Sequence, residues 1–135
     1  MVIVDTSVWV DFLNDDATPH TRWLDEHLAA ERLGVLDVIV CEVLQGLSTD
    51  KEAAAVLEEL LRFEVFETGG LDLATAAARN YRSLRRHGKT VRKTLDCLIA
   101  TFCLDGGHAL LHADSDFDPF ETFLGLRVIH PAPAE

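Results

Sequence analysis

The sequence has few cysteines, no long apolar run and few positive charges. Its three cysteines are odd in number and form no C-x-x-C pair, which argues against a disulfide framework and against a structural zinc site. Cys41, Cys97 and Cys103 all lie in apolar surroundings, so we expect buried free thiols in a reducing cytoplasm. No apolar stretch approaches the length of a membrane span, and no basic segment precedes the short apolar start. We therefore expect neither membrane insertion nor secretion.

Positive charge is scarce, with 12 Lys and Arg against 23 Asp and Glu and a formal net charge of −11. Such a balance normally argues against a nucleic-acid partner. The cations are unevenly distributed, however, because seven of the twelve form one basic stripe: Arg79, Arg82, Arg85, Arg86, Lys89, Arg92 and Lys93. The stripe is either a solvated helix face that pairs with surface acids or a contact for a phosphate backbone. Its candidate RNA contacts are Arg85, Arg86, Lys89 and Arg92.

Short apolar runs alternate with helical patterns along the whole chain. The 135 residues suit one domain with a single core, spanning 1–135. The apolar runs predict strands at 2–4, 33–36, 63–66, 109–112 and 126–129. Helical patterns fill the intervals, and Asp37 and Asp50 are expected to cap two of the helices. This alternation predicts an α/β fold with three α/β/α layers, in which helices flank a short, mainly parallel central sheet.

Four acids stand in settings where a carboxylate is unusual. Asp5 directly follows the apolar run MVIV, and Asp114 comes just after the predicted strand ALLH. Glu42, in VIVCEVL, borders an apolar helix face, and Asp96, in TLDCLIA, shares its side of a helix with apolar residues. Each acid taken alone could be a helix cap or half of an ion pair. Because sites in such sheets gather beyond the carboxyl ends of the strands, we expect the four to meet there.

Clustered carboxylates repel one another, by roughly 1 kcal/mol per pair at 4 Å in water and by more near a protein surface. Either some of them are protonated or a multivalent cation lies among them. Ligands that are all oxygen favour Mg²⁺, with Mn²⁺ as a substitute, over zinc. His108 and His112 flank a strand without a second ligand motif nearby, so we interpret them as hydrogen-bonded strand-end histidines. The predicted chemistry is metal-assisted hydrolysis of a phosphodiester.

The motifs DTSVWVDFL, CEVLQGL, KTLDCLIA and LLHADSDFD, in this order, resemble the PIN domain of VapC-type toxins over nearly the whole chain. The resemblance implies a toxin that is a Mg²⁺-dependent endoribonuclease, a homodimer and the target of a VapB-type antitoxin. Structured RNA such as transfer RNA is an implied substrate. Carried over by position, the acidic quartet is Asp5, Glu42, Asp96 and Asp114, with Asp116 as an additional metal candidate and with Thr6 and Ser7 as supporting hydroxyls. Which of Asp114 and Asp116 contacts the ion is left open.

Other functions remain alternatives at this stage. A phosphoacceptor signalling domain would need an acceptor Asp after a middle strand and a Lys after the last one, and neither is present. A haloacid-dehalogenase-like phosphatase would carry a second Asp two residues after Asp5, where Ser7 stands. A non-catalytic, RNA-binding PIN relative is the third alternative, although such a protein has little need for a complete acidic quartet.

Overall fold

The computed structural model describes residues 1–133, and its core is a five-stranded parallel sheet. The strands are β1 (Val2–Val4), β2 (Leu33–Leu36), β3 (Glu64–Phe66), β4 (Ala109–Leu111) and β5 (Arg127–Val128), in the spatial order β3-β2-β1-β4-β5. All four strand pairings are parallel. The three central strands are buried along their whole length, whereas both edge strands are partly exposed. This burial explains why the central strands are continuous apolar runs.

Helices fill the connections between the strands, as the alternating pattern predicts. The first half contains α1 (Thr6–Leu13), α2 (Pro19–His27), α3 (Asp37–Gln45) and α4 (Asp50–Leu60). The second half contains α5 (Leu71–Arg86), α6 (Thr94–Gly106), the single turn η1 (Ser115–Phe117) and α7 (Asp118–Leu124). Gly107 ends α6 in the left-handed region with φ 68°, which a residue with a side chain rarely adopts.

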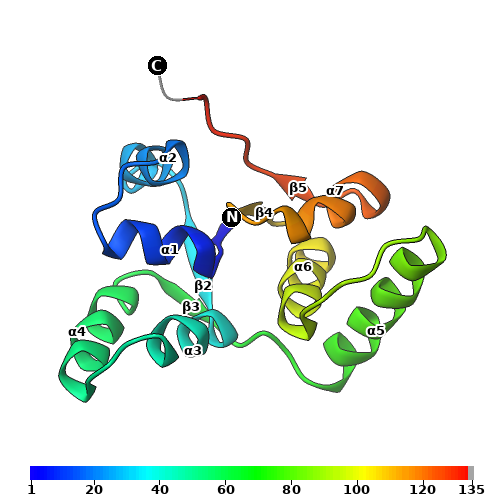
Figure 1. Ribbon diagram of the computed structural model, residues 1–135, viewed down its shortest axis with the longest axis horizontal. Helices are drawn as coiled ribbons and strands as arrows, with labels where there is room; N and C mark the ends of the chain where they lie inside the picture. The colour runs from blue at the N-terminus through cyan, green and yellow to red at the C-terminus, as the bar shows by residue number, and fades with distance from the viewer. Residues whose placement is uncertain (134–135) are drawn as a thin grey trace.

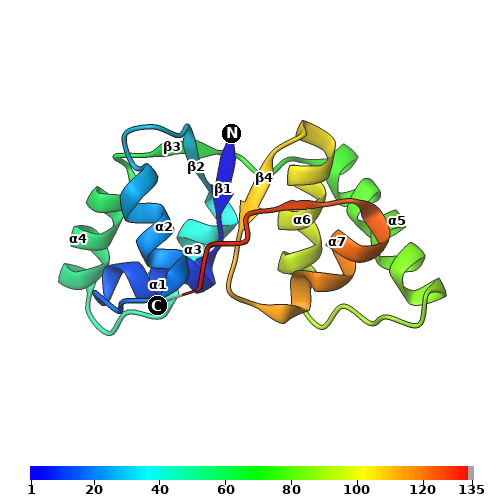
Figure 2. The ribbon, with the colours of Figure 1, turned by 90° about the horizontal axis from the view of Figure 1, so that it is seen from above.

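The helices form two groups on opposite sides of the central strands, which confirms the predicted three-layer α/β/α arrangement. Helices α1 to α4 pack against one another, and α5 packs against α6 and α7. Figures 1 and 2 show the first group on one side of β1 and β4 and the second group on the other. The crossover from β3 through α5 and α6 carries the chain back past β1 to β4.

This crossover creates a switch point in the sheet between β1 and β4. From β1 the chain first builds outward through β2 and β3, and it then returns to the opposite side of β1 with β4. Val4 pairs with Leu111 at the carboxyl end of the two strands, and the Asp5 amide donates to the Leu111 carbonyl at 3.0 Å. Helices leave the two strands on opposite faces at such a point, and a crevice remains between them. The residues that follow β1 and β4 therefore share one opening.

Three local predictions were wrong. Asp37 and Asp50 are the first residues of α3 and α4 rather than caps, because the extended Leu36 and Thr49 precede the helices. Thr49 supplies the side-chain cap of α4, and Asp37 instead binds the Thr68 amide at 3.0 Å. Cys41 is exposed, whereas Cys97 and Cys103 are buried free thiols as expected. The apolar neighbours of Cys41 in the sequence lie on the inner face of α3, and the thiol lies on the outer face.

Candidate active site

Asp5 is fixed at the end of β1 by burial and by the helix that follows it. Its side chain is 4% exposed and caps the N-terminus of α1, where Oδ2 accepts hydrogen bonds from the Ser7 amide at 3.1 Å and from the Ser7 hydroxyl at 2.7 Å. Burial raises the pKa of Asp5 above its ordinary value, the hydrogen bonds from Ser7 oppose this rise, and the nearby charge of Asp114 adds to it. Asp5 therefore caps a helix, but its charged form is also disfavoured by burial and by a neighbouring acid. Capping alone would require neither.

Ser7 joins the ends of the two central strands. Its hydroxyl donates to Asp5 and accepts a hydrogen bond from the Ala113 amide, which follows β4, at 3.0 Å. One side chain thus couples the carboxylate after β1 to the backbone after β4. The neighbouring Thr6 acts on a different acid, because its hydroxyl donates to Oε1 of Glu42 on α3 at 2.9 Å. The two hydroxyls that the sequence marks as supporting residues contact two of the four acids.

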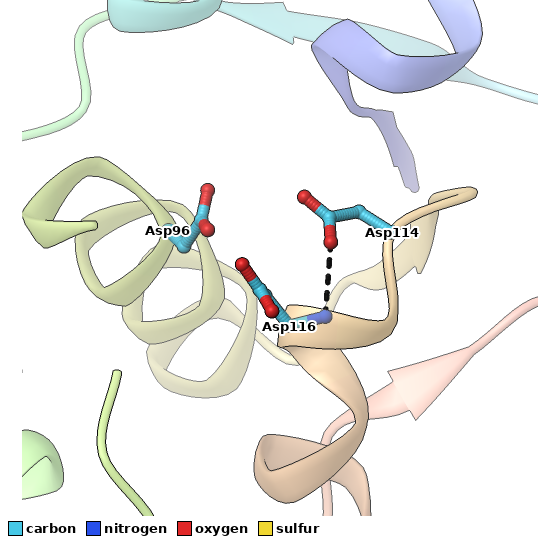
Figure 3. A group of neighbouring side chains, drawn as sticks. All are labelled: Asp96, Asp114 and Asp116. Atoms are coloured by element: carbon cyan, nitrogen blue, oxygen red, sulfur yellow. Dashed lines mark hydrogen bonds between the residues drawn. The ribbon is translucent and has the colours of Figure 1, made fainter. Parts of the chain in front are cut away.

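Asp114, Asp116 and Asp96 form the tightest acidic group in the described chain. Each offers a carboxylate oxygen, and these three oxygens all lie within 4.8 Å of one another. The Asp116 amide donates to Oδ1 of Asp114 at 2.9 Å, which closes the turn that begins η1. In Figure 3 the side chains from this turn and from α6 point toward a common space. Both Asp114 and Asp116 therefore lie beside Asp96, and Asp5 and Glu42 are near enough for their charges to act on Asp96.

Asp96 is a buried carboxyl with a raised pKa. It is 4% exposed, and its Oδ2 is buried without any hydrogen-bond partner among residues 1–133. Burial is the main cause that raises the pKa of Asp96 to about 7, and the negative charges of Asp5 and Asp114 contribute next. Lys93 opposes the shift, and Glu42 adds to it. At neutral pH this carboxyl is therefore about half protonated unless a cation compensates its charge.

The donor set fits a hard divalent cation. The converging groups are carboxylate oxygens from Asp96, Asp114 and Asp116, and among residues 1–133 no imidazole or thiolate belongs to this group within 4.8 Å. Carboxylates at such separations suit Mg²⁺ or Mn²⁺, which bind oxygen ligands and keep several waters. The orphaned Oδ2 of Asp96 is a buried acceptor that a cation would satisfy. The residues present therefore fit a metal site. Without a bound cation, the repulsion between the carboxylates is unfavourable.

The basic stripe is exposed, and none of its cations forms an ion pair within the described residues. All seven of its cations are exposed, on α5 or on the segment between α5 and α6. Residues 1–133 form three ion pairs, Arg32–Glu64, Arg62–Glu59 and His130–Glu121, and none involves the stripe. Arg85 instead lies over the ring of Tyr81, 5.6 Å from its centroid. The explanation that these cations pair with surface acids is therefore not supported.

Two residues near the site were not identified from the sequence as site residues. Lys93 belongs to the stripe, but it also immediately precedes α6, and its charge acts on Asp96. The spacing Lys93-x-x-Asp96 at a predicted helix start could have indicated this. His112 was interpreted as a hydrogen-bonded strand-end residue, and its Nδ1 does accept from the Asp114 amide, at 3.2 Å. No sequence pattern shows that its partner is the backbone of a site acid.

Comparison with known proteins agrees with this geometry. The family model for the PIN domain matches residues 2–121. Ribonuclease VapC11 of Mycobacterium tuberculosis is 35% identical over 133 residues, which cover 94% of this chain and 96% of that protein. The chain therefore belongs to the PIN-domain family and, within it, to the VapC group.

Solved structures share the fold at lower identity. The VapBC2 structure from Rickettsia felis, bound to a DNA fragment from its promoter, has a chain that matches with a TM-score of 0.75 and 16% identity, over 98% of this chain and 100% of that one. The VapBC-5 structure from M. tuberculosis matches with a TM-score of 0.68 and 25% identity, over 95% of this chain and 96% of that one. Both matches extend over nearly the whole chain, so the fold is shared from β1 to β5.

Proposed function

We propose that this protein is a Mg²⁺-dependent endoribonuclease and the toxin of a toxin–antitoxin pair. The observation that carries the proposal is the buried Oδ2 of Asp96, which has no hydrogen-bond partner among residues 1–133 and lies among the other acids at the switch point between β1 and β4. Such a cluster destabilises the protein unless a cation binds it, so its presence indicates a functional site. Membership of the VapC group supports RNA as the substrate.

In this proposal Asp96, Asp114 and Asp116 hold the ion directly, and Asp5 and Glu42 complete the negative surface around it. When bound, Mg²⁺ supplies a water of lowered pKa and neutralises charge on the phosphodiester. The chain's own contribution is rigidity: the Ser7 hydroxyl orients Asp5, and the Thr6 hydroxyl orients Glu42. Because the strand ends and two hydroxyls already fix these groups, little reorganisation is needed when substrate binds.

The basic stripe provides a path for the RNA backbone to this site. Its cations are exposed and form no ion pair with residues 1–133, and Arg92 and Lys93 extend it to the start of the helix that carries Asp96. An acidic metal site repels a polyanion, so cations beside it are needed to hold the backbone. We propose Arg85, Arg86, Lys89 and Arg92 as phosphate contacts. They position RNA without reading its bases.

A surface for the antitoxin is proposed between α1, α2 and α4. A cavity of about 270 Å³ there is lined mainly by apolar and aromatic side chains, among them Trp9, Phe12 and Phe63, with the charged Glu59 and Arg62 also in the lining. A peptide segment with apolar side chains would fill the groove. Structural neighbours titled as VapBC complexes support a VapB-type occupant.

The alternatives lose support, and two expectations remain proposals. A phosphoacceptor or haloacid-dehalogenase-like function does not agree with membership of the PIN family, and the acid cluster favours catalysis over passive RNA binding. Within residues 1–133, no helix is both long and apolar enough to cross a bilayer.

Three free cysteines support the cytoplasm as the place of action. The proposed homodimer is testable by sedimentation velocity.

The decisive experiment compares RNA cleavage by wild type, Asp5→Asn and Asp15→Asn in Mg²⁺, in Mn²⁺ and in EDTA. Asn caps a helix about as well as Asp, so Asp5→Asn removes a charge while it preserves the start of α1. Asp15 is exposed with φ 56°, a conformation that Asn tolerates, and it serves as the matched control. We expect metal-dependent cleavage by wild type and Asp15→Asn and none by Asp5→Asn, with toxicity in cells following the same order. Cleavage by Asp5→Asn at the wild-type rate would refute the site assignment.

A further inference from the structure

His112 lies directly after β4 and contacts the backbone of a site acid. It is 7% exposed, and its Nδ1 accepts a hydrogen bond from the Asp114 amide at 3.2 Å. Because a backbone N–H can only donate, Nδ1 carries no proton in this arrangement. The neutral ring must then carry its proton on Nε2.

The other ring nitrogen of His112, Nε2, is buried without a hydrogen bond to compensate among the described residues. The ring packs against Phe117 with 4.9 Å between centroids. Burial of an unsatisfied donor is unfavourable, and an apolar side chain of similar size would avoid it. The histidine therefore differs from an apolar core residue in one useful respect, the acceptor that it presents to Asp114.

That acceptor is the first link in a chain of contacts that leads into the acidic trio. The Asp114 amide is held by His112, and Oδ1 of Asp114 in turn accepts from the Asp116 amide at 2.9 Å. Figure 3 shows the second of these links and the two carboxylates that it arranges opposite Asp96. Two hydrogen bonds therefore connect the His112 ring to the turn that carries two of these three carboxylates.

We propose that His112 is a positioning residue for the metal site, acting through the Asp114 amide. It contacts neither the ion nor the substrate. Its neutral imidazole holds the turn after β4 so that Asp114 and Asp116 face Asp96 before any ion binds. The inference rests on the proposed function only in that these three acids bind the ion.

The matched variants His112→Asn and His112→Leu separate positioning from packing. Asn and Leu have nearly the same branched shape, but only Asn retains an acceptor close to the place of Nδ1. We expect His112→Leu to bind Mn²⁺ about 10- to 100-fold more weakly than wild type, as is typical when a residue that orients a metal ligand is removed. His112→Asn should bind Mn²⁺ with an affinity close to that of wild type. The electron paramagnetic resonance spectrum of its bound Mn²⁺ should match the wild-type spectrum.

Melting of the metal-free variants provides the control for folding. A purely structural histidine predicts that both variants melt lower and bind Mn²⁺ equally, and that result would overturn the proposal. Positioning predicts instead that the metal-free Leu variant melts no lower than the Asn variant, although its affinity for Mn²⁺ is reduced. NMR of the nitrogen-labelled imidazole in the metal-free wild type is an independent check. A proton on Nδ1 would also overturn the proposal.

Failure of this inference is distinguishable from failure of the proposed function. Wild type that binds Mn²⁺ without cleaving any RNA, together with weak binding by His112→Leu, refutes the ribonuclease and supports positioning. RNA cleavage together with equal Mn²⁺ affinity in wild type and both variants refutes positioning alone. Wild type that binds no Mn²⁺ refutes both.

Discussion

Asp96→Asn should stabilise the metal-free protein at high pH. The pKa of Asp96 is about 7 in the folded protein, against about 3.9 in an unfolded chain. The folded state therefore retains a proton that the unfolded state releases, and the stability from this group is present below about pH 4 and lost as the pH rises to about 7. Asn is permanently neutral, so the variant does not lose this contribution.

The expected size follows from the pKa difference. Three units at about 1.4 kcal/mol each give an upper limit of about 4 kcal/mol above pH 7. The new amide must find hydrogen-bond partners in a buried place, which offsets about 1 kcal/mol or more of this gain. We therefore expect a gain of about 2–3 kcal/mol at pH 8 and a much smaller difference at pH 4. For a chain of this length the gain corresponds to roughly 10 °C in Tm.

The assay is thermal melting of wild type, Asp96→Asn and Asp15→Asn in EDTA across this pH range. The difference between each variant and wild type cancels the contributions of those titrating groups that do not interact with the substituted residue. Asp15→Asn should stay near zero throughout, because its carboxylate is exposed. A variant difference that does not grow with pH would refute the argument that Asp96 is destabilised by burial and by its acidic neighbours.

Metal binding should offset the stability difference between wild type and Asp96→Asn. An ion that binds only the folded state adds about 2.7 kcal/mol at one hundred times its dissociation constant. Wild type should gain this stability in Mn²⁺, and Asp96→Asn should gain little. Equal gains in both proteins would mean that the ion binds elsewhere.

Further predictions concern the supporting hydroxyls and the basic stripe. Ser7→Ala removes the link between Asp5 and the Ala113 amide, so it should cost about 1–3 kcal/mol of stability and weaken Mn²⁺ binding, as melting and titration calorimetry would show. Thr6→Val should weaken Mn²⁺ binding less, because the Thr6 hydroxyl binds Glu42, whereas the Ser7 hydroxyl also binds the Ala113 amide next to Asp114. Replacing Arg85, Arg86, Lys89 and Arg92 with Ala in the Asp5→Asn background should lower RNA affinity across sequences and reduce the salt slope by about 0.7 for each phosphate that the variant no longer binds. An unchanged salt slope in the folded variant would remove the stripe from the RNA-binding surface.

The sequence by itself determined the layers of the fold and the candidate acids. The apolar runs are short and do not alternate with polar residues, as expected for strands that are covered on both faces. They indicated a buried parallel sheet, and the structure confirms it. Asp5 and Asp114 stood out because each follows such a run with almost no loop between them. These are local signals, because the apolar pattern and the position of an acid directly after it can both be recognised within a few residues.

Only the tertiary structure decided which groups meet and which contacts hold them. The switch point arises from the order β3-β2-β1-β4-β5, and no local pattern specifies that β4 lies beside β1. The bond from Ala113 to Ser7 joins residues 106 positions apart, and the raised pKa of Asp96 depends on acids from three other segments. Exposure of Cys41 likewise depends on which face of α3 meets the core. A sequence specifies the groups that can perform chemistry, but their separations and burial are set by packing between segments that the chain brings together only when it folds.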